Sequence, residues 1–149
     1  CGFAFAGKLK KEKSKVYALL SDGECNEGLT WEAAMFAGFH KLNNLITIID
    51  YNKLQSLTTT TKTLDLEPFR DKWESFGWKC IEMNGNDIMV LKKNLTQISK
   101  SKEKKPICII AHTTKGYGVS FMENKVLWHY RSPNEKELEL ALKEINNER

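Results

Sequence analysis

Two short stretches of the sequence carry residues suited to holding a hard divalent cation. Asp22 and Gly23 follow one apolar run of strand length, and Asn52 and Leu54 follow a second. A carboxylate, a side-chain amide and a backbone carbonyl supply the oxygen ligands that Mg²⁺ or Ca²⁺ prefers. Mg²⁺ is commonly held by one or two carboxylates and completed by phosphate groups of a ligand. The alternative interpretation is a plain strand–turn–helix in which Asp22 caps the helix, because Asp-Gly is frequent in turns.

The segments around these residues predict an α/β fold, a doubly wound parallel sheet with helices on both faces. Residues 16–20 and 45–50 are continuous apolar runs, the pattern of strands buried on both faces. Two further strands are expected at residues 79–83 and 107–111, and helices at residues 29–41, 66–76, 88–98 and from Ser132 onward. The carboxyl ends of parallel strands meet at one edge of the sheet. Asp22, Asn52 and the loop 112–118 are therefore expected to lie together.

Several apolar positions are expected to face the core. On the helix 29–41 they are Trp31, Ala34, Met35, Gly38 and Phe39. The polar segment 53–62 has no usable period and is expected to be a loop.

Composition limits the classes of function. The 149 residues fit one domain, 1–149, and no segment approaches the roughly 20 apolar residues of a membrane-spanning helix. The net charge is +4, but the lysines are dispersed among acids, so solvated loop charge is favoured over a nucleic-acid surface. We expect neither a nucleic-acid nor a membrane partner. The four cysteines lack zinc-ligand spacing and are expected to be reduced, buried thiols of a cytoplasmic protein: Cys1, Cys25, Cys80 and Cys108.

The Asp22 and Asn52 stretches, in this order and spacing, resemble the thiamin diphosphate motif of the transketolase superfamily. The likeness extends over nearly the whole chain. It is carried by residues 22–33, 41–45, 76–78, 111–124 and 128–130. The last two segments are similar to the N-terminal, diphosphate-binding subunit of split, two-gene transketolases. Where the family usually has Gly before the Asp, this chain has Ser21, which is tolerable unless that position needs a positive φ.

The resemblance implies a role for individual residues at the site. Asp22, Asn52 and the backbone carbonyl of Leu54 would bind Mg²⁺ (or Ca²⁺), which anchors the diphosphate of thiamin diphosphate. Gly23 would lie against that diphosphate, and Lys115 would contact the cofactor.

Two residues are implied to be catalytic. His129 would contact both cofactor and substrate, where a neutral imidazole can donate a hydrogen bond or move a proton. Glu27 matches a glutamate of the family's dimer interface, part of a carboxylate network between two active sites. A first-turn helix acid, favourable beside the helix dipole, is compatible with that role.

The implied reaction is reversible two-carbon ketol transfer between ketose and aldose phosphates, as in the pentose phosphate pathway. The cofactor performs the carbanion chemistry and the protein orients it. The implied partners are a C-terminal transketolase subunit carrying the pyrimidine domain, and further copies forming a dimer or heterotetramer. In the family, the histidines that bind sugar and diphosphate lie before the position that corresponds to Cys1. The domain is therefore expected to lack its N-terminal segment.

Two alternatives remain open at this point. One is another thiamin diphosphate enzyme, either a deoxyxylulose-phosphate synthase or a 2-oxo acid dehydrogenase α subunit. The other is a truncated, non-catalytic domain.

Overall fold

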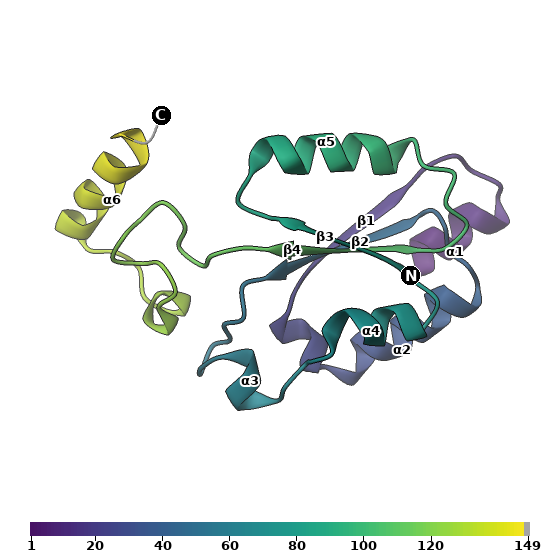
Figure 1. Cartoon of the computed structure of the whole chain (residues 1–149), viewed down its shortest axis with the longest axis horizontal. Helices are drawn as coiled ribbons and strands as arrows, with labels where there is room; N and C mark the ends of the chain where they lie inside the picture. The colour runs from purple at the N-terminus through teal and green to yellow at the C-terminus, as the bar shows by residue number, and fades with distance from the viewer. Residues whose placement is uncertain (148–149) are drawn as a thin grey trace.

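The computed structural model describes residues 1–147 and has a four-stranded sheet at its centre (Figure 1). The elements, in chain order, are α1 (Gly2–Leu9), β1 (Val16–Ser21), η1 (Gly23–Asn26), α2 (Gly28–Phe39), β2 (Leu45–Tyr51), α3 (Thr60–Thr63), α4 (Phe69–Ser75), β3 (Lys79–Asn84), α5 (Ile88–Ser99), β4 (Ile107–His112), η2 (Val126–His129) and α6 (Glu135–Asn147). The strand order is β1-β2-β4-β3 and every pair is parallel. Helices α2 and α4 lie on one face and α5 on the other. The predicted α/β doubly wound fold is therefore confirmed.

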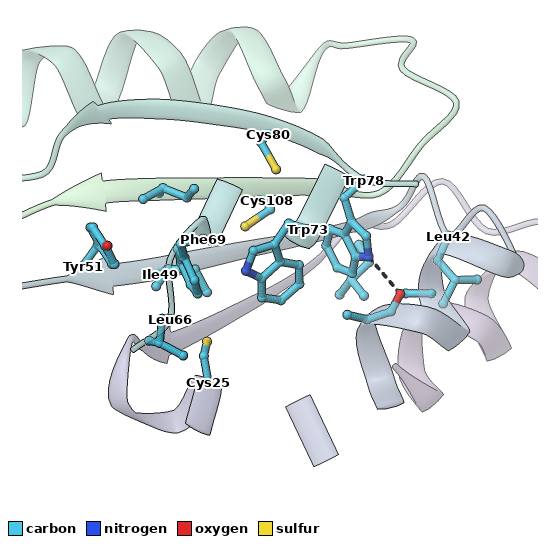
Figure 2. Packing of buried hydrophobic residues seen from close by; sticks show 14 of the residues in the cluster. Cys25, Leu42, Ile49, Tyr51, Leu66, Phe69, Trp73, Trp78, Cys80 and Cys108 are labelled. Carbon is cyan, nitrogen blue, oxygen red and sulfur yellow. Dashed lines mark hydrogen bonds between the residues drawn. The ribbon is translucent and has the colours of Figure 1, made fainter. Parts of the chain in front are cut away.

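The larger core lies between the sheet and the face carrying α2 and α4 (Figure 2). Its centre is aromatic: Trp73 packs edge-on against Trp78, and Phe69 stacks on Tyr51. The Trp78 indole N–H donates to the Ala34 carbonyl at 2.9 Å, which ties α2 to the start of β3. A smaller aliphatic cluster fills the space under α5. Two layers of side chains thus hold the sheet that carries the site.

The backbones of α2 and α4 come into direct contact at Gly38. A Cβ atom at this position would overlap the carbonyl oxygen of Phe76, so only glycine allows the helices to approach this closely. The residue after Phe76, Gly77, has φ +87° and ends α4 in the left-handed conformation typical of a helix C-terminus.

Strand β1 was expected to be buried on both faces, and this is wrong. It is an edge strand, and Tyr17 and Leu19 are 48% and 73% exposed. The alternate side chains, Val16 and Leu20, pack against the larger core. The apolar run correctly predicts a strand, but the place of that strand in the sheet decides its burial.

Three helices also differ in detail from expectation. In α2, Phe39 is 81% exposed and Met35 is half exposed, and the buried positions are Ala34 and Ala37. The segment expected to be a loop contains the short helix α3, capped by the Thr59 hydroxyl, which accepts from Lys62 N–H. Helix α4 begins at Phe69, three residues later than expected.

Helix α6 begins later than expected, at Glu135. Asn134 Oδ1 accepts from Glu137 N–H, and Glu137 Oε2 accepts from Asn134 N–H, a reciprocal cap that sets the start of the helix after Asn134. With the loop that precedes it, α6 lies beyond the carboxyl ends of the strands, apart from the two helical layers (Figure 1).

All four cysteines carry free thiols. Three are buried as expected, but Cys1 is exposed. Burial raises the pKa of the Cys25 thiol to about 12, so this group stays protonated and behaves as a small apolar side chain. In residues 1–147 no helix is long and apolar enough to cross a bilayer.

Candidate functional site

The carboxylate of Asp22 is fully buried at the carboxyl end of β1. Its Oδ2 atom accepts a hydrogen bond from the Lys53 N–H at 2.5 Å. Its Oδ1 atom has no hydrogen-bond partner among residues 1–147. A buried oxygen left unpaired costs roughly 1–3 kcal/mol, and more when it is charged. A cation or a hydrogen-bond donor that bound this oxygen would therefore stabilise the site.

Burial raises the pKa of the Asp22 carboxyl above its ordinary value, and the nearby negative charge of Asp50 raises it further. The Lys53 N–H opposes this shift by bonding the ionised form. The side chain does not cap η1, the role that the plain turn interpretation gave it. Instead it reaches across to the turn after β2.

That turn, residues 52–54, has at its centre a positive φ, which residues other than glycine rarely adopt. Lys53 has φ +64°, which places its N–H on Asp22 and lets its carbonyl accept from Thr60 N–H at 3.0 Å. Leu54 N–H donates to Asn52 Oδ1 at 2.9 Å. The two expected ligands, Asn52 and Leu54, are thus held against Asp22 in one compact turn, the cation turn.

Ser21, the last residue of β1, joins the loop before α2 without backbone strain. Ser21 N–H donates to Glu24 Oε2 at 2.7 Å, and Glu24 N–H donates to Ser21 Oγ at 3.2 Å. Ser21 is not one of the described non-glycine residues with positive φ. The serine therefore closes the loop with its own hydroxyl where the family usually has glycine.

A cavity of about 400 Å³ opens in front of the buried carboxylate. It is lined by six of the seven residues expected at the site, the exception being Asp22, which lies behind its wall: Gly23, Glu27, Asn52, Leu54, Lys115 and His129. Residues far apart in the sequence therefore meet at one edge of the sheet.

Lys115 and His129 reach the cavity from the long segment after β4. The Lys115 carbonyl accepts from Asn124 N–H at 2.9 Å, which folds this segment back on itself. Trp128, beside the exposed His129, donates its indole N–H to the Phe121 carbonyl at 3.0 Å and packs edge-on against that ring. These contacts fix the backbone of the segment. The side chains of Lys115 and His129 line the cavity, where they can meet a ligand.

Glu27 is exposed at the N-terminal end of α2 and makes no capping bond with its side chain. Its carboxylate lines the cavity and is accessible to another chain or ligand.

Five residues that line the cavity were not among those expected at the site: Ser21, Glu24, Asp50, Gln55 and Ser56. Asp50 is the second carboxylate at the carboxyl end of the sheet, and its position two residues before Asn52 was a usable signal. Gln55 donates its side-chain amide to Asn26 Oδ1, and its Cγ would lie 3.3 Å from a Cβ at Gly23. Nothing in the sequence indicated that contact.

The residues present fit a phosphate-bound divalent cation. Among residues 1–147 no three His, Cys, Asp or Glu side chains gather as a metal site. These residues offer one unpaired carboxylate oxygen beside an amide and a backbone carbonyl. Such a set suits Mg²⁺, which keeps ligand positions for phosphate and water.

The family described as the thiamine diphosphate binding domain of transketolase matches residues 7–146. The chain belongs to this family. Its sheet and helices are those of a thiamin diphosphate-binding domain. Asn52 lines the cavity, and Asp22 lies buried between two residues that line it, Ser21 and Gly23.

Comparison with known proteins gives the same family. The chain is 43% identical over 145 residues to a subunit of the apulose-4-phosphate transketolase of Phocaeicola vulgatus, covering 97% of this chain and 51% of that protein. It is 45% identical over 147 residues to the subunit of the same name from Actinobacillus succinogenes, covering 99% and 52%. The transketolase structure from Campylobacter jejuni superposes with a TM-score of 0.90 at 31% identity, over 97% of this chain and 24% of that one. The chain thus spans about half the length of these two subunits.

Proposed function

We propose that residues 1–149 form the diphosphate-binding domain of a transketolase and hold thiamin diphosphate through Mg²⁺, or through Ca²⁺ in its place. The observation that carries this proposal is the buried Oδ1 of Asp22, which has no hydrogen-bond partner in the part of the chain that the structure describes and lies beside the turn of Asn52 and Leu54. A divalent cation there would satisfy the carboxylate and attract a diphosphate.

Each residue of the site has a defined role in this proposal. Asp22, Asn52 and the Leu54 carbonyl hold the cation, and Gly23 leaves room for the diphosphate beside the loop. Lys115, which also lines the cavity, adds a positive charge.

The bound cofactor supplies the carbanion chemistry that the implied two-carbon ketol transfer between ketose and aldose phosphates requires. The protein residues bind, orient and move protons. His129 has an exposed imidazole and lines the cavity. In this proposal it donates to a substrate hydroxyl or accepts its proton. In the same proposal the exposed Glu27 joins a carboxylate network with a second chain.

A complementary chain is part of the proposal. Both relatives are named as subunits of a transketolase, and this chain covers about half of each. We therefore propose assembly with a C-terminal subunit carrying the pyrimidine domain, and pairing of such units into a dimer or heterotetramer. The three buried free thiols support a reducing, cytoplasmic location.

Calorimetric titration of thiamin diphosphate with Mg²⁺ into the chain assembled with its complementary subunit tests the half-site. We expect saturable, Mg²⁺-dependent binding that Asp22→Ala abolishes. Thr96→Val, which removes a hydroxyl bond to the Lys92 carbonyl on α5, is the control and should bind like the unmodified chain. Equal affinity of the Asp22→Ala variant would refute the cation site.

The reaction class is tested with two substrates. Transfer from xylulose 5-phosphate to an aldose phosphate is the expected activity. Turnover of pyruvate alone would instead favour a different thiamin diphosphate enzyme, and cofactor binding without either turnover would favour a non-catalytic domain.

A further inference from the structure

Asp50 links the ends of three strands at the site. Its backbone carbonyl accepts from Asp22 N–H at 3.1 Å, which joins the end of β2 to that of β1. Its carboxylate Oδ1 accepts from the hydroxyl of Thr113, the first residue after β4. The two segments are 63 residues apart in the sequence, and this bond joins them beside the cavity.

Thr113 begins the loop that carries Lys115, and it is held from two sides. Its N–H donates to the Tyr51 carbonyl at 3.4 Å, while the next N–H, of Thr114, donates to Asn86 Oδ1 at 2.8 Å. The Thr113 methyl packs where a Cβ on Gly85 would be. The side chain therefore makes two separable contacts, a hydroxyl bond toward Asp50 and methyl packing toward Gly85.

We propose that Asp50 and Thr113 act as a positioning pair, holding the loop so that Lys115 faces the diphosphate. This inference rests on the proposed function. A lysine is a point charge on a flexible stem, so its contribution to binding depends on where its backbone is fixed. A hydroxyl bond to a carboxylate is stronger than a neutral one and suits that purpose.

The two contacts of Thr113 allow a matched test. Thr113→Val keeps a methyl of the same shape but removes the hydroxyl, whereas Thr113→Ser keeps the hydroxyl and removes the methyl. In the assembled protein we expect Thr113→Val to weaken Mg²⁺–thiamin diphosphate affinity about tenfold and Thr113→Ser to change it less than about twofold. Thr96→Val is the control for loss of a threonine hydroxyl bond at a distance from the site.

A double-mutant cycle separates positioning from general loosening. If the pair acts through Lys115, Thr113→Val should have almost no effect on affinity in the Lys115→Ala background. Amide hydrogen exchange in the ligand-free protein supplies a readout independent of the cofactor. We expect faster exchange at residues 114–118 in Thr113→Val but not in Thr113→Ser.

The outcomes are distinct. Absence of binding by the unmodified protein would overturn the proposed function together with this inference. Normal binding by the unmodified protein and equally by Thr113→Val would overturn the positioning pair alone. A larger loss in Thr113→Ser than in Thr113→Val would show that packing against Gly85 is what matters and would also overturn it.

Discussion

Two acidic clusters lie at the same edge of the sheet and are built in opposite ways. In the β1–β2 corner, Asp22 and Asp50 are two carboxylates, and the buried one keeps an oxygen without a partner among the described residues. In the β3–β4 corner, Glu82 is half exposed and bonds His112 Nε2 at 2.8 Å and Arg70 at 3.4 Å. One corner sets a buried carboxylate beside a half-buried one, and the other pairs an exposed carboxylate with a basic side chain.

The pKa shifts of the two corners have opposite signs. Burial, with the charge of Asp50, raises the pKa of Asp22, whereas the hydrogen bond from His112, with help from Arg70, lowers the pKa of Glu82. A paired, exposed carboxylate is already satisfied and needs no ligand. An unpaired buried carboxylate is costly until something binds it, which is why we assign the cation site to the β1–β2 corner.

The sharpest test of the contrast is Asp22→Asn. The amide retains an acceptor for Lys53 N–H but has no charge to hold a cation, so Mg²⁺–thiamin diphosphate affinity should fall at least about 100-fold. The same change should raise the free energy of unfolding of the ligand-free protein by about 1–3 kcal/mol, because the buried charge is removed. Calorimetry and urea denaturation measure the two effects. A ligand-free variant less stable than the unmodified chain would contradict the assignment of an unfavourable buried charge to Asp22.

The pH dependence of stability should carry the signature of the same carboxylate. The folded chain keeps the Asp22 proton to higher pH than the unfolded chain, whose pKa is near 3.8. Stability of the ligand-free protein should therefore fall as pH rises from that value through the raised pKa, and remain reduced above it.

The difference between the unmodified chain and Asp22→Asn isolates this effect from other carboxylates. Urea denaturation from about pH 4 to about pH 8 should show the two curves diverging as pH rises. Mg²⁺ with thiamin diphosphate should restore the free energy of unfolding of the unmodified chain at neutral pH. This stabilising effect should disappear as the pH falls and Asp22 becomes protonated. Parallel curves would remove Asp22 as the titrating group.

Asp50→Asn offers a smaller change in the same corner. The amide oxygen can still accept from the Thr113 hydroxyl, but the charge that raises the pKa of Asp22 is gone. We expect the ligand-free protein to gain about 0.5–1 kcal/mol in the free energy of unfolding at neutral pH. Urea denaturation checks this, and a loss of stability would mean that the hydroxyl bond needs the full carboxylate.

The smallest effect is expected in the β3–β4 corner. Glu82→Gln removes an ion pair that water already screens, so the thermal midpoint should move less than about 2 °C and cofactor affinity should not change. Differential scanning calorimetry and the binding titration measure both. A loss of affinity comparable to that of Asp22→Asn would erase the distinction between the corners.

The sheet could be predicted from the sequence because unbroken apolar runs indicate strands, and the segments between them have the periodicity of amphipathic helices. Strands that alternate with helices favour a parallel sheet. The burial of β1 could not, since it depends on which strands flank it, and an apolar run looks the same at an edge or in the middle. Helix α2 shows the same limit: its core contacts are the small residues Ala34 and Ala37, which carry little hydrophobic signal.

The contact between Asp22 and the turn 52–54 was foreseeable because Asp22 and Asn52 each follow a strand, and the ends of parallel strands converge. The Asp50–Thr113 bond was not, because it depends on the register that sets Asp50 opposite Ala111 in β4. A side-chain pair across 63 residues of sequence has no local pattern to predict it.

Gly38 connects the packing of α2 to the position of the site residues at the start of this helix. Helix α2 starts at Gly28, beside the cavity, and presses against Phe76 near its other end, so its twelve residues act as a rod of about 18 Å. A Cβ atom at Gly38 would overlap the Phe76 carbonyl oxygen, so we expect Gly38→Ala to move α2 away from this contact. Glu27, at the start of the same helix, should then shift relative to residues 52–54, and a substitution outside the cavity lining would change the site.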